Sequence, residues 1–223
     1  MSKWIALFQL MCLVLPWRLR RRALIAALNW EIHPSARIGR SILMVLRLRM
    51  GPRARIGHFT FARNVELLEL GAGSSLGNKN WISGFTLGSD RAFTDCGRRA
   101  VLSIGDEAAI THGHRIDCTD SVTVGAFTTV AGWDTQFVTH AISVYDARQR
   151  CAPITIGRYC FVGTRCTLLK GAELPDYSVL GAGSVLAHKM SETYRLYSGI
   201  PAKSVKPLPS DSQYFTRNEG PCF

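Results

Sequence analysis

The segment 156–190, IGRYCFVGTRCTLLKGAELPDYSVLGAGSVLAHKM, decides the fold because its aliphatic residues recur at every sixth position. The repeating aliphatic residues are Ile156, Val162, Leu168, Leu174, Leu180 and Leu186. Small residues follow four places after the first five of them: Cys160, Cys166, Ala172, Ser178 and Ser184. A helix repeats apolar residues at three and four positions and a simple strand at two, so neither fits. The period predicts an all-β fold: a parallel β-helix with three short strands to a coil, whose stacked coils bury one core.

The same period extends towards the N-terminus with two interruptions. It runs through Ile32, Ile38, Met44, Met50, Ile56, Leu70, Leu76, Ile82, Ile104, Ile110, Ile116 and Val122, and then, after a two-residue shift, Val124 and Val130. We expect an excursion over 89–99 that touches substrate, since loops on rigid scaffolds often carry binding groups. We expect a second, extended loop over roughly 141–153. The repeat domain is therefore placed at 31–192, between an N-terminal segment 1–30 and a tail 193–223 whose end we expect to be unstructured.

Composition narrows the possible partners. The 223 residues are 47% hydrophobic, which excludes general disorder and allows one elongated domain. A formal net charge of +11 fits nucleic acid, an anionic membrane surface or a phosphorylated small molecule. The sequence contains no recognisable nucleic-acid-binding module, so we favour membrane and cofactor over nucleic acid. The seven cysteines are scattered without a CxxC pair, which fits the reduced cytoplasm.

The N-terminal segment pairs an apolar run with arginines. WIALFQLMCLVL occupies 4–15, and four arginines follow within 18–22. The run is shorter than the roughly 20 residues that span a bilayer. Its charges follow it, whereas a secretory signal carries them in front. We therefore expect an amphipathic helix in peripheral contact with the inner face of the cytoplasmic membrane. The alternative is a helix that only caps the open end of the β-helix core.

Three motifs give the repeat a family likeness. They are VTHAI at 138–142 with PITIG at 153–157, LGAGSVL at 180–186, and SGIPAK at 198–203. Over most of 32–208 the chain resembles the hexapeptide-repeat acyltransferases, in particular bacterial saccharide O-acetyltransferases. The resemblance implies a left-handed β-helix, an exception to the usual right-handed crossover. It also implies a homotrimer with sites between subunits, and direct transfer of acetyl from acetyl-CoA to a saccharide hydroxyl, without metal or covalent acyl-enzyme.

The resemblance also implies roles for individual residues. His140, just before the second loop, matches the family's general base, and imidazole accepts a proton near neutrality. Thr164 and Ala182, eighteen residues apart, match the positions that contact the pantetheine arm. The complete set of implied cofactor-binding residues is Gly163, Thr164, Gly181, Ala182, His188 and Lys203. The glycines permit close backbone approach, and Lys203 is a point charge suited to the CoA phosphates.

Three further polar residues are candidates for substrate binding: His114, Asp117 and Asp134. Counting hexads places His114 and Asp134 on the same side of the prism one coil apart, where the repeat normally has a small residue. Polar groups in such positions need partners or a purpose. We expect Asp117 or Asp134 either to orient His140 or to bind sugar hydroxyls.

Two other functions remain open at this stage. His112, His114 and His140 resemble the three zinc ligands of carbonic-anhydrase-type β-helices, which are metal-dependent hydratases. The SGIPAK motif argues against that function, because a hydratase does not use a CoA-side motif. The other alternative is a β-helix that acts only as a scaffold, since one fold hosts many functions.

Overall fold

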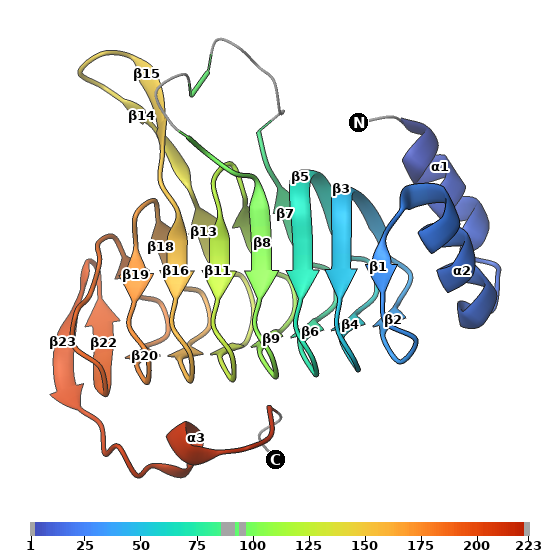
Figure 1. Cartoon of the computed structure of the whole chain (residues 1–223). Coiled ribbons are helices and arrows are strands. Elements are labelled where there is room, and N and C mark those ends of the chain that lie inside the picture. Colours follow the sequence, from blue (N-terminus) through green and yellow to red (C-terminus); the bar gives the residue numbers. More distant parts are fainter. Residues whose placement is uncertain (1–2, 86–91, 94–96, 221–223) are drawn as a thin grey trace.

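The computed structural model describes residues 3–85, 92–93 and 97–220. Over these ranges the chain forms a left-handed parallel β-helix, an elongated prism closed at its N-terminal end by two helices (Figure 1). Each coil contributes one strand to each of three faces, and successive coils pair in parallel. The period of six therefore predicted the fold correctly, because one face and its corner use six residues.

The strands divide into three faces. The first face contains β1 (Glu31–Ile32), the second halves of β3 (Ile42–Met50) and β5 (Phe61–Leu70), β8 (Val101–Ile104), β11 (Val122–Val124), β16 (Ile154–Ile156) and β19 (Glu173–Leu174). The second face contains β2 (Arg37–Ile38), β4 (Arg55–Ile56), β6 (Ser75–Leu76), β9 (Ala109–Ile110), β12 (Thr129–Val130), β17 (Phe161–Val162) and β20 (Val179–Leu180). The third face contains the first halves of β3 and β5, then β7 (Trp81–Ser83), β10 (Arg115–Asp117), β13 (Gln136–Val138), β18 (Thr167–Leu169) and β21 (Val185–Leu186).

Three corners join these faces. The first corner, between the first and second faces, comprises 33–36, 51–54, 71–74, 105–108, 125–128, 157–160 and 175–178. The second corner, before the third face, comprises 39–41, 57–60, 77–80, 111–114, 131–135, 163–166 and 181–184. The third corner returns the chain to the first face and comprises, among the described residues, 84–85, 97–100, 118–121, 139–153, 170–172 and 187–188.

Register explains the core. On the second face Ile110 pairs with Leu76 on one side and Val130 on the other, and all three side chains are buried. The first-face strands β8, β11 and β16 bury two side chains each, as Val122 and Val124 do in β11. This second buried position accounts for the two-residue shift of the period after Val122.

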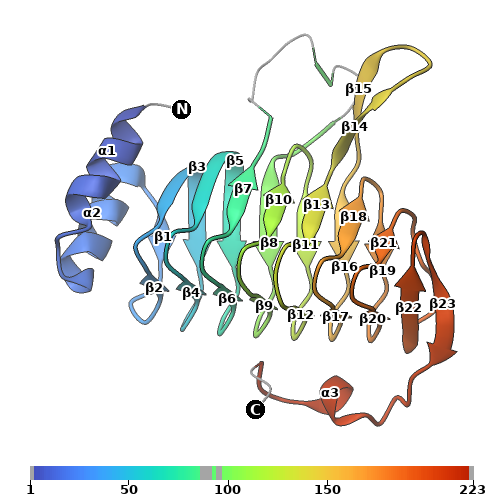
Figure 2. The same ribbon diagram turned by 180° about the vertical axis from the view of Figure 1, so that it is seen from behind.

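Both interruptions of the repeat fall at the third corner. The expected loop over 141–153 is an antiparallel hairpin of β14 (His140–Ser143) and β15 (Arg148–Cys151), which projects from the prism in both views (Figures 1 and 2). Of the expected excursion, residues 92–93 and 97–99 are described, and the remainder of 89–99 lies outside the described residues.

The N-terminal segment caps the first coil. Helices α1 (Lys3–Cys12) and α2 (Trp17–Leu28) lie across the open end of the prism (Figure 1). The Gln9 amide donates to the Leu43 carbonyl at 2.8 Å and accepts from the Leu43 amide at 2.9 Å, and Leu24 joins the buried core. The capping arrangement is therefore present, and it uses one side of the helix pair.

The described part of the C-terminal tail, 193–220, is folded, so the expectation of an unstructured end is wrong for these residues. β22 (Arg195–Gly199) continues the second face, β23 (Ala202–Pro207) pairs with it antiparallel, and α3 (Gln213–Thr216) returns beneath the first corner (Figure 1). There it meets a stack of four rings from Phe127, Tyr159, Tyr177 and Tyr194. Phe215 packs against the rings of Tyr177 and Tyr194 and is buried. These outward-facing rings supply the apolar surface that orders the tail.

Candidate active site at the third corner

His140 lies where the chain leaves the prism for the hairpin. It follows β13, whose Phe137 is buried and pairs in register with Ile116 of β10 and Leu168 of β18. The stacked coils thus fix the backbone that carries His140. The imidazole itself is half-exposed, with 35% of its side-chain surface accessible.

Asp117 holds the imidazole. It ends β10, one coil before His140, and its Oδ2 lies 2.7 Å from His140 Nδ1. The same carboxylate accepts hydrogen bonds from the backbone amide and hydroxyl of Thr119 at Oδ1, at 3.0 and 2.7 Å. Thr139 donates to Oδ2 in the same way, at 2.8 and 2.7 Å. A carboxylate with this many donors is held rigidly, so the ring orientation of His140 is fixed by the prism.

The pKa values of the pair follow from these contacts. Burial alone would raise the pKa of Asp117, but hydrogen bonds from His140, Thr119 and Thr139 outweigh it and lower that pKa below its ordinary value. The hydrogen bond to Asp117 raises the pKa of His140, against the opposing effect of burial. The pair therefore combines an ionised carboxylate with an imidazole that is a stronger base than a free histidine. Because Asp117 engages Nδ1, Nε2 is the nitrogen available to a substrate.

The excursion contributes apolar and cationic groups beside the imidazole. The Phe93 ring meets the His140 ring edge-on with centroids 6.0 Å apart. Arg98 lies over Phe93, 5.1 Å from the ring centroid, and donates to the carbonyl of Thr119. Phe93, from the excursion that we expect to touch substrate, therefore lies beside His140. Phe93 and Arg98 lie outside the six-residue repeat, so sequence periodicity could not identify them. Thr119 and Thr139 were also missed, although polar residues beside Asp117 and His140 were a usable signal.

The other two predicted substrate residues lie at the second corner. As expected, His114 and Asp134 are there one coil apart, but neither contacts His140. His114 is fully buried, with Nδ1 accepting from the Thr135 amide and Nε2 bonded to the Thr111 hydroxyl. Burial, with a smaller effect of His112, lowers its pKa to about 4. His114 thus ties the corner together through both ring nitrogens, and it also lines a hollow of about 480 Å³ with Arg115 and Asp134. Its expected role in substrate binding stays a prediction.

Asp134 is exposed and lines a hollow of about 330 Å³ on the third face, with Arg115, Gln136, Arg165 and Thr167. This hollow is polar and carries two arginines. Two other hollows, of about 630 and 560 Å³, lie along the early coils at the first and second corners, away from His140.

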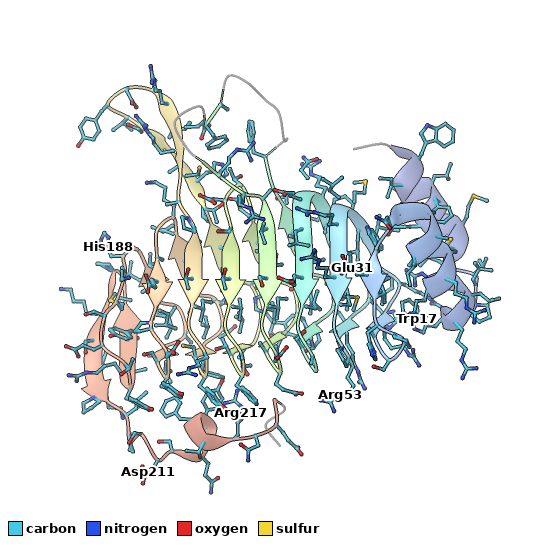
Figure 3. All side chains as sticks on the ribbon, viewed as in Figure 1. Trp17, Glu31, Arg53, His188, Asp211 and Arg217 are labelled. Carbon is cyan, nitrogen blue, oxygen red and sulfur yellow. The ribbon has the colours of Figure 1, made fainter. Side chains whose placement is uncertain are left out.

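Most of the predicted cofactor residues share the second corner. Gly163 and Ala182 lie one coil apart, and a Cβ on Gly163 would come 2.6 Å from the Ala182 amide nitrogen. The glycine thus permits close stacking of this chain's own coils. Thr164 exchanges hydrogen bonds with the backbone of Trp133, and Gly181 faces Ser198, the residue that pairs with Lys203. His188 departs from this set, since it lies on the edge of the prism from which the hairpin rises (Figure 3).

The structure separates the three histidines of the hydratase alternative. His112 and His114 are at the second corner and His140 is at the third, with β13 between them. His112 accepts from the Asn78 amide through Nδ1, and both ring nitrogens of His114 are used within the chain. Over the described ranges, no group of three or more histidine, cysteine, aspartate or glutamate side chains is arranged to hold a metal ion.

Comparison with known proteins found similarity at the level of the fold. No protein-family model and no curated protein matches the sequence. Among solved structures, the polysialic acid O-acetyltransferase OatWY superposes with a TM-score of 0.59 at 18% identity, covering 80% of this chain and 84% of that one. A hexapeptide-repeat-containing acetyltransferase from Vibrio cholerae O1 biovar eltor, complexed with acetyl coenzyme A, superposes with a TM-score of 0.52 at 23% identity, covering 63% of this chain and 71% of that one.

Proposed function

We propose that this protein is an acyltransferase that moves an acetyl group from acetyl-CoA to a hydroxyl of a saccharide, with His140 as the general base. The observation that carries the proposal is the 2.7 Å contact between His140 Nδ1 and Asp117 Oδ2. It orients an imidazole with a raised pKa at the corner from which the hairpin projects. The fold shared with an acetyl-CoA-bound acetyltransferase and a polysaccharide O-acetyltransferase supports the choice of donor and acceptor class.

The residues act in a simple sequence. Asp117 keeps the proton of His140 on Nδ1, so Nε2 has a free lone pair. Nε2 takes the proton of the acceptor hydroxyl while that oxygen attacks the thioester carbonyl. The tetrahedral intermediate collapses as the carbon–sulfur bond breaks, and the imidazolium returns its proton to the departing CoA sulfur. Asp117 stabilises the imidazolium between these two proton transfers.

A complete site requires more than one copy of the chain. His140 is at the third corner, whereas Gly163, Thr164, Gly181 and Ala182 are at the second. Four residue steps of extended chain, from Thr135 to Thr139, span about 13 Å between those corners. In the proposed homotrimer the second corner of one copy lies beside the third corner of the next, and acetyl-CoA binds in that seam. Exposed apolar side chains at the tip of the hairpin support such packing, with Val144 87% and Tyr145 98% accessible in one chain.

Substitution of His140 tests the proposal. His140→Ala is expected to lower turnover by about 10² to 10⁴ while CoA binding, followed by thermal shift, stays nearly unchanged. The assay measures CoA thiol release from acetyl-CoA with a panel of neutral and anionic saccharides, and mass spectrometry identifies the acetylated product. Lys170→Ala, an exposed change at the same corner, is the matched control. An unaltered rate in His140→Ala removes His140 from the mechanism, and failure of the wild type to bind CoA favours a scaffold. Light scattering gives the number of copies.

A further inference from the structure

The helix cap has an inner face that seals the prism and an outer face covered with apolar side chains. Trp4 is 75% accessible, Met11 69% and Val14 87%. The other large apolar residues exposed on α1, α2 and their connection are Leu7, Leu10, Leu15 and Leu19. We name these seven residues the outer patch. Capping does not account for them, because the cap's own packing uses Leu24, Gln9 and Arg20 on the opposite side.

The arginines of α2 divide in the same way. Arg20 is buried and donates to the carbonyls of Ile38 and Gly39, at 3.3 and 2.9 Å. Arg21 donates to the Ile32 carbonyl at 3.0 Å. Arg18 and Arg22 instead are exposed beside the outer patch. Two of the four arginines therefore belong to the cap, and two are left for an outside partner.

We propose that the outer patch docks the protein onto an anionic membrane surface, with Arg18 and Arg22 on the lipid headgroups. Residues 1–30 contain Lys3 and four arginines and no aspartate or glutamate, so the segment is complementary to anionic lipid. Exposed tryptophan and leucine side chains are suited to the boundary between headgroups and acyl chains. Within the described ranges, no helix has the length and apolarity needed to cross a bilayer, and the docked helices lie along its surface.

Charge decides between lipid and a second copy of this chain. Two copies joined through the outer patch would bring Arg18 and Arg22 against the same arginines, with no carboxylate in either segment to pair with them. Like charges placed together in an interface are unfavourable. An anionic bilayer meets both the apolar side chains and the two arginines without such repulsion.

Docking through the cap places the candidate active site above the membrane. Four steps of the third face, from β3 through β5, β7 and β10 to β13, lie between the first coils and His140. At about 4.8 Å a step, the imidazole is roughly 20 Å along the prism from the cap. Where the proposed function holds, the acceptor is a saccharide whose reacting hydroxyl extends about that far from the bilayer.

Vesicle flotation tests the docking surface without using activity, so it fails or succeeds independently of the proposed function. The full chain is mixed with phosphatidylcholine vesicles or with phosphatidylcholine–phosphatidylglycerol vesicles. We expect recovery only with the anionic vesicles, and more than tenfold weaker binding for Met11→Asp/Val14→Asp. Val205→Asp, an exposed apolar residue at the other end of the prism, is the matched control and binds as the wild type does.

The arginine contribution is measured separately. Arg18→Gln/Arg22→Gln should weaken binding by about fivefold for each arginine at low salt, while Lys170→Gln/Lys206→Gln leaves it unchanged. Wild-type flotation by Met11→Asp/Val14→Asp overturns the proposal. So does equal binding to neutral and anionic vesicles. A third outcome also overturns the proposal: the wild type binds neither kind of vesicle, and light scattering shows that Met11→Asp/Val14→Asp loses an oligomer that the wild type forms. That result would assign the outer patch to a second copy of the chain.

Discussion

Replacing Asp117 with asparagine removes the negative charge that faces His140 and keeps the side chain's size. The asparagine amide cannot replace the carboxylate without loss, because both carboxylate oxygens accept hydrogen bonds. Oδ1 receives two hydrogen bonds from Thr119, and Oδ2 receives two from Thr139 in addition to the His140 contact. Whichever way the amide turns, its NH₂ group points at hydrogen-bond donors. Asp117→Asn therefore weakens both the orientation of the imidazole and the stabilisation of the imidazolium.

The magnitude follows from one charged hydrogen bond. Such a bond contributes about 1.5–3 kcal/mol, and it is strongest when His140 is protonated during transfer. Loss of that stabilisation in the transition state corresponds to a rate lowered by about 10- to 150-fold. This is smaller than the loss expected for His140→Ala, because the imidazole remains present in the asparagine variant.

The pH dependence of the rate should also reveal the interaction between Asp117 and His140. The base must be neutral, so kcat/KM rises as pH increases through the raised pKa of His140. Without the Asp117 charge, burial remains and acts to lower that pKa. The acidic limb of the profile should therefore move to lower pH in Asp117→Asn, even as the maximum rate falls. A general loss of structure would lower the rate without moving the limb in this direction.

The assay is CoA thiol release across a pH series, with saccharide acceptor at a fixed concentration. Thr139→Val is the matched comparison, since it removes one hydroxyl donor to Asp117 and keeps the charge on the carboxylate. It should shift the limb less than Asp117→Asn does. A profile for Asp117→Asn that superposes on the wild type, in rate and in the position of the acidic limb, would refute the pairing of Asp117 with His140 as a catalytic unit.

Two further predictions concern parts of the fold away from His140. Phe215→Ala should weaken docking of the tail on the stacked rings by about 3 kcal/mol, because the Phe215 ring is buried against Tyr177 and Tyr194. Faster tryptic cleavage after Arg217 would report the weaker docking, and an unchanged cleavage rate would contradict the prediction. Gly163→Ala should lower the free energy of unfolding, measured in urea, by about 1–3 kcal/mol, because the new Cβ would lie 2.6 Å from the Ala182 amide nitrogen. The control is Gly97→Ala, whose Cβ has no atom of the described residues within 4 Å. Equal stability of the two variants would argue against the close stacking at Gly163.

The prism could be predicted from sequence because its core positions are periodic. Leu76, Ile110 and Val130 follow one another on the second face, and every coil must fill the same interior position. Placement of Cys160 and Cys166 at small corner sites followed from the same rule, and both are buried. The period reports only side chains that point inward. It could not reveal the stacked rings of Tyr159 and Tyr177, which point outward, nor the tail that packs on them.

The sequence identified the polar residues near the site, but it did not determine the role of each one. Hexad counting correctly placed His114 and Asp134 at one corner, but a count of positions does not say whether a buried polar group is satisfied. His114 is, through Thr111 and Thr135. Asp117 was assigned two possible roles, and its contact with His140 supports the orienting one. Sequence spacing could not make that choice, because the two residues are 23 positions apart and meet only through the stacking of β10 on β13.

The interruptions of the repeat carry the most information about function. A β-helix that served only as a spacer would have no reason to break its period twice at one corner. Here both breaks, at 84–85 and at the hairpin of β14 and β15, fall between the third and first faces. Their meeting point is the contact between Phe93 and His140. Because corners of successive coils lie above one another, insertions many residues apart in sequence are brought to a single edge. That edge is where an outside molecule can be enclosed without disturbing the core, and it holds His140, whose pKa is raised by the hydrogen bond to Asp117.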